Sequence, residues 1–167
     1  MNKALVGITM WTAIPILAQS NSIRFGTQYS ISTPIKYLSN KAGLGLQLGG
    51  HAKLEINSDY SLMTRIDIAK YIHNNGTNIV NLNLGADCIY HFENHQVGPY
   101  LTAGINQQSY RTSFSDGTAT KNSNGIGSSI GMGYDIDRYL GVQTRYVISR
   151  INHKNYSTMN IGVTYTF

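Results

Sequence analysis

Most of the chain beyond residue 22 alternates between apolar and polar positions with a period of two. In the clearest run, Leu44, Leu46 and Leu48 are separated by glycine and glutamine. Neighbouring side chains of a strand point to opposite faces, so this pattern predicts strands with one apolar and one polar face. Eight such segments follow one another, without a competing helical period. They span residues 23–31, 42–56, 60–69, 80–92, 100–108, 126–136, 140–149 and 159–167.

The polar face of these segments carries charges of both signs among many glycines. A soluble sandwich turns its apolar face inward, whereas an outer-membrane barrel turns it toward lipid and lines its lumen with the polar face. Glycine weakens a strand on a sandwich surface, but in a narrow lumen it makes room for long charged side chains. The pattern therefore favours an all-β fold, an eight-stranded antiparallel up-and-down transmembrane β-barrel, over an exported soluble sandwich or lipocalin-like binder.

The charges on the polar face are expected to form a network that fills the lumen, because opposite charges there can pair. On two neighbouring strands, a ladder is expected in which Lys53 and Glu55 lie beside Arg65 and Asp67. A lumen eight strands wide is just filled by side chains, so a narrow ion path is the less favoured alternative. The predicted lumen charge network consists of Arg24, Lys53, Glu55, Arg65, Asp67, Asp87, Asp135 and Arg145.

The connections between segments have the lengths expected of such a barrel. Barrels in the outer membrane have short periplasmic turns and longer external loops. With the N-terminus in the periplasm, the polar loop 114–122, one of the two longest, is external and is the best-placed candidate for a binding segment. The expected periplasmic turns are 57–59, 93–96 and 137–138, and the expected outer loops are 33–41, 74–76, 114–122 and 152–155.

The first twenty residues differ from the rest of the chain. Lys3 supplies a short positive segment, and the apolar stretch that follows is too short, and too interrupted by a proline, for a transmembrane helix. Small residues offer a cleavage site after Ser20 or, alternatively, after Ala18. We expect a signal peptide over residues 1–20, an outer-membrane barrel domain over 21–167, and export to the cell outer membrane.

Aromatic residues gather near the predicted strand ends, as in the girdles that mark the boundary between lipid and water. The last segment alternates and closes on an aromatic residue. Tyr165 and Phe167 therefore look like the membrane-assembly signal that barrel-insertion machinery reads. The aromatic residues near strand ends are Tyr29, Tyr60, Tyr90, Phe92, Tyr134, Tyr139, Tyr165 and Phe167.

Composition narrows the function classes. The chain has 17 Gly and 12 Tyr but only 3 Pro, which suits strands and tight turns. Its formal net charge of +5 is mild, and without a run of Lys and Arg we expect no nucleic acid partner. Cys88 is the only cysteine, which excludes an intramolecular disulfide and a cysteine-cluster metal site.

Four stretches of the chain carry a family resemblance: residues 43–53, 99–104, 135–146 and 162–167. With them, over roughly residues 23–167, the chain resembles the small outer-membrane β-barrel proteins, the group of OmpX, the OmpA transmembrane domain and the opacity proteins. The resemblance implies a barrel without an open channel, used for surface interaction, adhesion or envelope integrity. We expect as partners outer-membrane lipids and lipopolysaccharide, with barrel-insertion machinery and periplasmic chaperones during biogenesis; an extracellular ligand stays open.

Five histidines raise the alternative of a lipid A-modifying enzyme, which would need a Ser/His pair with a carboxylate or amide partner. His153, close to Ser149, Asn155 and Ser157, is the best placed, but the tight His-x-Ser-Asn spacing is missing. We therefore expect a non-enzymatic protein with no catalytic residue.

The remaining histidines suggest no chemistry. His51 and His91 are predicted to point into the lumen, and His73 and His95 to lie in loops, without a paired spacing for a metal. We accordingly expect no metal and no cofactor.

Overall fold

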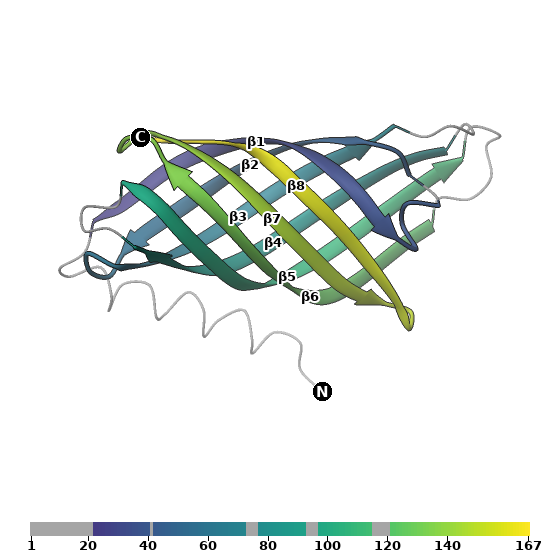
Figure 1. The fold of residues 1–167 in the computed structure, drawn as a ribbon. Helices are drawn as coiled ribbons and strands as arrows, with labels where there is room; N and C mark the ends of the chain where they lie inside the picture. Colours follow the sequence, from purple (N-terminus) through teal and green to yellow (C-terminus); the bar gives the residue numbers. More distant parts are fainter. Residues whose placement is uncertain (1–21, 41, 73–76, 93–96, 115–120) are drawn as a thin grey trace.

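The computed structural model describes residues 22–40, 42–72, 77–92, 97–114 and 121–167. Within them, antiparallel strands pair in chain order and β1 pairs with β8, so that the sheet closes into a barrel (Figure 1). The predicted eight-stranded all-β barrel is confirmed. The strands are β1 (Ile23–Lys36), β2 (Gly45–Glu55), β3 (Tyr60–Tyr71), β4 (Thr77–His91), β5 (Gly98–Phe114), β6 (Lys121–Asp135), β7 (Leu140–Ile151) and β8 (Lys154–Thr166).

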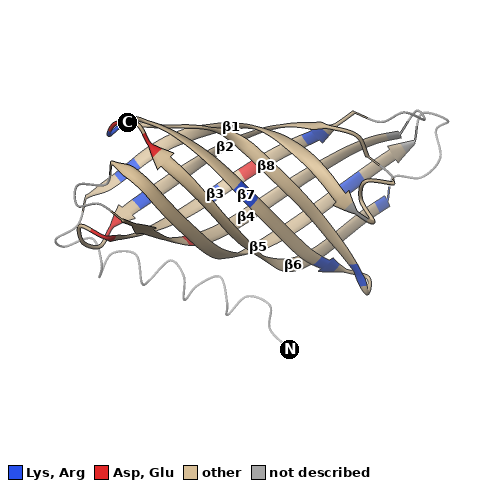
Figure 2. Ribbon diagram, in the orientation of Figure 1, with Lys and Arg blue, Asp and Glu red and all other residues tan. Residues whose placement is uncertain are grey.

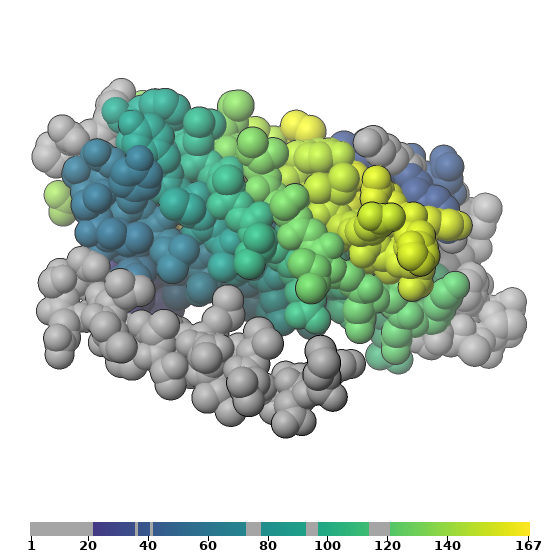
Figure 3. Space-filling view, turned by 90° about the horizontal axis from the view of Figure 1, so that it is seen from below, coloured from purple at the N-terminus to yellow at the C-terminus, as the bar shows by residue number. Residues whose placement is uncertain are grey.

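Alternate side chains point to opposite sides of the barrel wall, with the apolar ones outside. Leu44, Leu46 and Leu48 are 56%, 68% and 53% exposed, whereas Arg65 and Asp67 are 4% and 1% exposed. This is the reverse of a soluble protein and is the arrangement that the alternation predicts for an outer-membrane barrel. In the space-filling view the strands follow one another around the outer surface in sequence order (Figure 3). Among the described residues, no helix is long and apolar enough to cross a membrane.

The barrel has two different ends. The end that holds Ser22, Phe167 and the β2–β3, β4–β5 and β6–β7 connections is called the terminal end below, and the opposite end is called the loop end. At the terminal end, the predicted turns 57–59 and 137–138 are observed between the strands. The predicted turn at 93–96, like the predicted signal peptide, lies outside the described residues.

The two described turns at the terminal end use the same local device. In the β2–β3 turn, Asn57 Oδ1 accepts hydrogen bonds from the backbone N–H of Asp59 (3.0 Å) and Tyr60 (2.7 Å). In the β6–β7 turn, Asp137 Oδ1 accepts them from Tyr139 (2.7 Å) and Leu140 (2.8 Å). Asn and Asp favour turns because their short side chains bond the backbone a few residues on, which ends one strand and begins the next.

At the loop end the strands extend beyond the predicted boundaries. Residues 33–36 belong to β1, Phe114 to β5 and residues 121–122 to β6, so the predicted loops 33–41 and 114–122 are too long. The predicted loop 152–155 is a two-residue turn in which Asn152 and His153 have φ of 48° and 63°. Two consecutive positive φ angles are those of a type I′ turn, which matches the twist of a β-hairpin. The predicted loop 74–76 lies outside the described residues.

Candidate functional site

The middle of the lumen holds a compact set of charges, here called the central charge network: Arg65, Asp67, Asp87 and Arg145. Arg65 Nη1 lies 2.6 Å from Asp67 Oδ2, and its Nε lies 2.6 Å from Asp87 Oδ2. Arg145 Nη2 lies 3.4 Å from the same oxygen of Asp87. Two cations balance two carboxylates, and all four side chains are almost completely buried. In such surroundings each charge depends on its partners for solvation.

Neutral polar side chains complete the hydrogen bonds of these carboxylates. Asp67 accepts hydrogen bonds from the Gln28 amide and from Asn83 Nδ2, the latter at 3.0 Å. Asp87 Oδ1 accepts one from the Ser129 hydroxyl at 2.8 Å. Gln28 in turn accepts one from Gln143 Nε2 at 2.9 Å. The network therefore joins strands on opposite sides of the barrel, which favours a fixed lumen.

Each member of the central charge network faces a glycine on a neighbouring strand. A Cβ added at Gly85 would lie 3.0 Å from Cζ of Arg65, closer than ordinary van der Waals contact. The sequence-based interpretation that glycines make room for long lumen side chains agrees with this geometry. The facing pairs are Gly49 with Asp67, Gly85 with Arg65, Gly104 with Asp87, and Gly131 with Arg145.

The other four predicted lumen charges lie together near the terminal end. Arg24 pairs with Glu55, and its Nη1 also donates to the backbone oxygen of Arg138 at 3.0 Å. Lys53 Nζ lies 3.5 Å from Asp135 Oδ2. The ladder expected from Lys53 and Glu55 with the neighbouring strand is therefore wrong in its pairing.

The reason is geometric. Side chains that point into a narrow lumen meet across it, so the partner of Lys53 comes from β6 rather than from β3. Figure 2 shows acidic and basic positions together at the terminal end and midway along the barrel, whereas the described charged positions at the loop end are basic.

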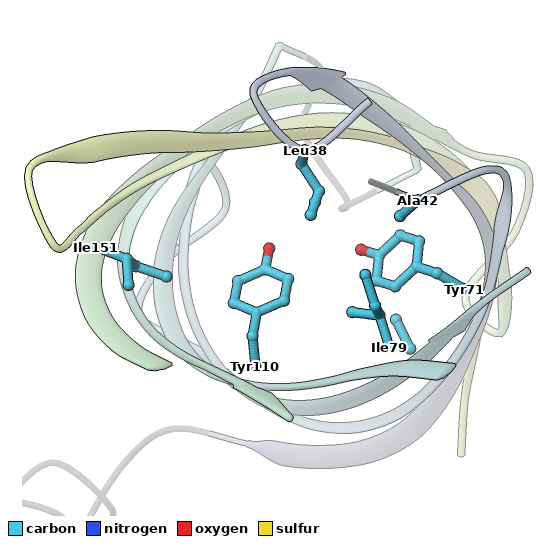
Figure 4. Packing of buried hydrophobic residues seen from close by; sticks show 7 residues of the cluster. Leu38, Ala42, Tyr71, Ile79, Tyr110 and Ile151 are labelled. Atoms are coloured by element: carbon cyan, nitrogen blue, oxygen red, sulfur yellow. The ribbon is translucent and has the colours of Figure 1, made fainter. Parts of the chain in front are cut away.

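The lumen near the loop end is apolar. A set of inward side chains, here called the loop-end cluster, includes Leu38, Tyr71, Tyr110 and Ile151, each exposed by 2% or less (Figure 4). The two tyrosine hydroxyls remain hydrogen-bonded, Tyr71 to Ser32 Oγ (3.0 Å) and Tyr110 to Gln108 Oε1 (2.9 Å). The cluster consists of Leu38, Ala42, Ala69, Tyr71, Ile79, Tyr110 and Ile151, with Tyr156 packed against it.

The sequence-based prediction missed this cluster and misplaced Ala42. Ala42 was expected on the outer face with Leu44, but it is 5% exposed and packs inside. Because β2 begins only at Gly45, Leu38 and Ala42 lie outside any strand and can turn into the mouth of the barrel. The period-two alternation of β4 could have predicted that Ile79 points inward, because Ile79 lies two residues from the inward-pointing Asn81.

Aromatic contacts fasten the β1–β2 connection across the loop end. The Tyr37 ring lies 5.3 Å from the Tyr156 ring, centroid to centroid, and Tyr156 lies 5.1 Å from Tyr110. Lys154 Nζ stands 4.5 Å from the centre of the Tyr37 ring. The connection that carries Leu38 is thus attached to β8 as well as to its own strands.

The histidines are scattered. His51 and His91 are 7% and 1% exposed inside the lumen; His51 Nε2 lies 3.1 Å from Thr166 Oγ1. His153 is exposed in the β7–β8 turn, whereas the Ser149 hydroxyl donates into the lumen to Asn106, 3.2 Å away. His73 and His95 lie outside the described residues. Within the described part of the chain, no three His, Cys, Asp or Glu side chains could hold a metal ion.

Exposed aromatic side chains surround the outside of the terminal end. Tyr165 packs between Tyr139 (6.5 Å between ring centroids) and Phe167 (6.4 Å). The backbone N–H of Phe167 donates to Phe25 O at 2.7 Å, so the end of the chain is hydrogen-bonded to β1. Tyr29, which was expected among these residues, instead lies in the middle of β1, opposite Leu48 and Val163.

One ionisable group outside the strands is held by the backbone. In the exposed β6–β7 turn, hydrogen bonds from the N–H groups of Leu140 and Tyr139 lower the pKa of Asp137 below its ordinary value. Backbone donors stabilise the ionised carboxylate, so this turn is most stable when Asp137 is charged.

Comparison with known proteins gives one consistent result. A family model described as "Outer membrane protein beta-barrel domain" matches residues 6–167. Among solved structures, the chain is similar to Neisserial surface protein A, with 19% identity, a TM-score of 0.62, and coverage of 89% of this chain and all of the other. No curated protein matches the chain.

Two further solved structures show the same fold. Ail, the attachment invasion locus protein of Yersinia pestis, has 12% identity and a TM-score of 0.59, over 88% of this chain and 97% of Ail. The N-terminal β-barrel domain of Pseudomonas aeruginosa OprF has 16% identity and a TM-score of 0.58, over 89% of this chain and 100% of that domain. At these identities the likeness concerns the fold alone.

Proposed function

Because the chain belongs to the outer membrane protein β-barrel domain family, we propose that it is a closed barrel with a structural and surface-interaction role in the outer membrane. Its loop end faces the exterior and its terminal end faces the periplasm. The observation that carries this proposal is the content of the lumen, which is occupied by side chains at three successive levels.

The three levels support a barrel without a continuous aqueous path. The loop-end cluster closes the outer mouth, the central charge network links opposite strands, and the Lys53–Asp135 and Arg24–Glu55 pairs lie below it. Eight strands enclose a space that side chains just fill. We therefore favour a plugged lumen over a narrow porin-like channel.

The external role rests on the surfaces that such a barrel offers. The closed lumen leaves the loop-end connections and the outer wall as contact surfaces for other molecules. Lipopolysaccharide and other outer-membrane lipids are the proposed partners at the wall, and an extracellular ligand would meet the loop end. During biogenesis, Tyr165 and Phe167 would be read by the barrel-insertion machinery after delivery by periplasmic chaperones.

Two measurements on the purified protein test the proposal. A folded membrane barrel migrates faster on a gel before heating than after heating, and we expect this shift after reconstitution into lipid vesicles. In planar bilayers we expect no stable unit conductance. A reproducible conductance step would contradict the plugged lumen and favour the channel. Absence of the heat-dependent shift, with recovery in the soluble fraction, would contradict membrane residence itself.

An enzymatic role is tested separately. Lipid A from cells with and without the protein is compared by mass spectrometry, and we expect identical acylation patterns. A change in acyl-chain number would instead favour a lipid A-modifying enzyme.

A further inference from the structure

Charge is distributed very unevenly along the barrel. The described acidic residues are central or lie toward the terminal end, whereas the loop end is basic (Figure 2). Each strand that runs toward the loop end carries a cation close to that end. The basic residues of the strands at this end are Lys36, Lys70, Arg111, Lys121, Arg150 and Lys154. This excess of positive charge would attract an anionic partner.

Two of these cations lie side by side on the outside of the barrel. Lys70 in β3 and Arg111 in β5 both pair with Val80 of the strand between them. Both side chains are exposed. Strands in a sheet are about 4.8 Å apart, so the two Cα atoms are separated by about 10 Å, a span that two long side chains can close around one anion. Asn122, opposite Arg111 on β6, is also exposed and adds an amide.

The surface next to this pair on the terminal-end side is apolar. Ile68 and Ile66 follow Lys70 on the same face of β3 and are 55% and 50% exposed, and Leu82 lies beside Ile68 at 37%. Above Ile105 on β5, the outward positions become polar, with Gln107 first. On β5 the cation therefore stands beyond the apolar belt, at the level of lipid headgroups. On β3 the exposed Ile72 lies one outward position beyond Lys70, whose long side chain can extend toward the same level.

A groove continues from this surface. It has a volume of about 460 Å³. Its lining comprises the outward side chains of Phe25, Ala52, Thr64 and Ile66, the glycines Gly26 and Gly50, and the inward residues His51 and Arg65. Small residues at 50 and 52 lie opposite Ile66 and Thr64, so the wall is hollow between the larger Phe25 and Ile66 side chains. Ile66 belongs to the same face of β3 as Lys70, which makes the groove and the cation pair parts of one continuous surface.

We propose that this surface is a specific site for a phosphorylated lipid of the outer leaflet. The phosphate lies between Lys70 and Arg111 above Val80, and one acyl chain runs past Ile68 and Ile66 into the groove. A hydrogen-bonded phosphate with two cationic donors is a strong contact, and the groove adds burial of methylene groups. The inference rests on the membrane residence proposed above. A soluble sulfated glycan, which could also bind cations, would not need the groove.

Native mass spectrometry of the purified protein in neutral detergent micelles tests the site. Phosphatidic acid is compared with a diacylglycerol that has the same acyl chains, and we expect at least about tenfold tighter binding of the phosphate form. Lys70→Gln with Arg111→Gln should remove this preference. The matched control, Lys121→Gln with Arg150→Gln, removes the same charge at the same end and should keep it.

The groove is tested by filling it. Ala52→Phe should weaken binding of long-chain phosphatidic acid severalfold but leave dihexanoyl phosphatidic acid unaffected, because the short chains do not reach it. Equal loss of binding in the control pair, or equal effects of Ala52→Phe on both lipids, would overturn the site. Sucrose octasulfate provides a further control. If it displaced the lipid equally from the wild type and from Ala52→Phe, Lys70 and Arg111 would be assigned to a soluble polyanion, and the lipid site would be overturned.

The failure of this inference is distinguishable from failure of the proposed function. Each variant is first shown to retain heat-modifiable migration in neutral vesicles, because outward substitutions should not unfold the barrel. If the wild-type protein inserts into vesicles but binds phosphatidic acid no better than diacylglycerol, only the lipid site is refuted. A wild type that does not embed refutes the proposed function, and the site with it.

Discussion

In the middle of the lumen Arg65 is held by two carboxylates, whereas near the loop end Tyr71 and Tyr110 are packed among aliphatic side chains. Both regions fill the same lumen, and β3, β4 and β7 contribute inward residues to each. The central charge network depends on mutual pairing, since each buried charge is costly without its partner. The loop-end cluster is stabilised by close packing and burial of apolar surface. Truncation of one side chain therefore removes only part of that stabilisation. The two regions should therefore respond differently to substitution.

The largest effect is expected at the centre. Arg65→Leu leaves Asp67 and Asp87 buried without the cation that they share, which should lower the free energy of unfolding by about 3–5 kcal/mol. Urea unfolding in lipid vesicles, followed by heat-modifiable migration, measures it. In Arg65→Leu/Asp67→Leu, which also removes the carboxylate left without a cation and keeps the Asp87–Arg145 pair, we expect partial recovery. A loss below about 1 kcal/mol for Arg65→Leu would show that the charges do not depend on one another.

Truncation in the loop-end cluster should cost somewhat less. Tyr110→Ala removes a buried ring and leaves a cavity that strands on both sides hold open, so we expect a loss of about 3 kcal/mol in the same assay. Tyr110→Phe removes only the hydrogen bond to Gln108 and should lose about 1 kcal/mol. If the phenylalanine variant lost as much as alanine, the hydroxyl rather than packing would stabilise this region.

Two glycines test whether space for an added side chain is limited in the lumen but not on the outer surface of the barrel. Gly85→Val would push against the Arg65 guanidinium and should destabilise the barrel by about 1–3 kcal/mol. Gly50 is the control, because an added Cβ there meets only the Gly26 backbone oxygen at 3.8 Å. Gly50→Val should be neutral or slightly stabilising. Equal losses at both sites would mean that strand propensity, not lumen space, decides the outcome.

The smallest effect is expected in the β6–β7 turn, outside both regions. The pKa of Asp137 is lower in the folded protein than in the unfolded chain. The charged carboxylate therefore stabilises the fold fully at pH values above the pKa that Asp137 has in the unfolded chain. This stabilisation is lost as the pH falls through the pKa of Asp137 in the folded protein. Asp137→Ala should therefore be less stable than wild type at neutral pH, and the difference should shrink in acid. Unfolding midpoints of both proteins at several pH values measure it. A difference that stays constant with pH would show that charge plays no part.

The comparison also explains how far the sequence was informative. Alternation located all eight strands, because lipid outside and polar groups inside impose it along the central part of each strand. It failed at the loop end, where β5 and β6 leave the apolar belt and both faces become polar, as at Gln107 and Asn124. The expected outer loop 33–41 begins before Pro34, yet β1 continues through it to Lys36.

Within the lumen, the sequence specified which residues point inward but not which of them meet. Arg65, Asp67, Asp87 and Arg145 are buried on the inward face, which strand parity determines, whereas the side chains of Arg24 and Glu55 at the terminal end are 25% and 21% exposed. The Lys53–Asp135 contact crosses the barrel and depends on strand tilt and register, which local pattern does not contain. The loop-end cluster includes Leu38 and Ala42, which lie between β1 and β2, and the alternation of the strands does not describe their path.

The account depends most on the direction of neighbouring side chains in one strand, and β4 offers a direct test. Cys88 is exposed on the outer face, whereas Ile89 is 3% exposed inside. A fluorescent bimane is attached to Cys88, or to Ile89→Cys in a Cys88→Ala background, and the protein is reconstituted with lipids brominated on their acyl chains. We predict strong quenching at position 88 and little at position 89. Quenching at 89 without quenching at 88, or equal quenching at both, would contradict the account.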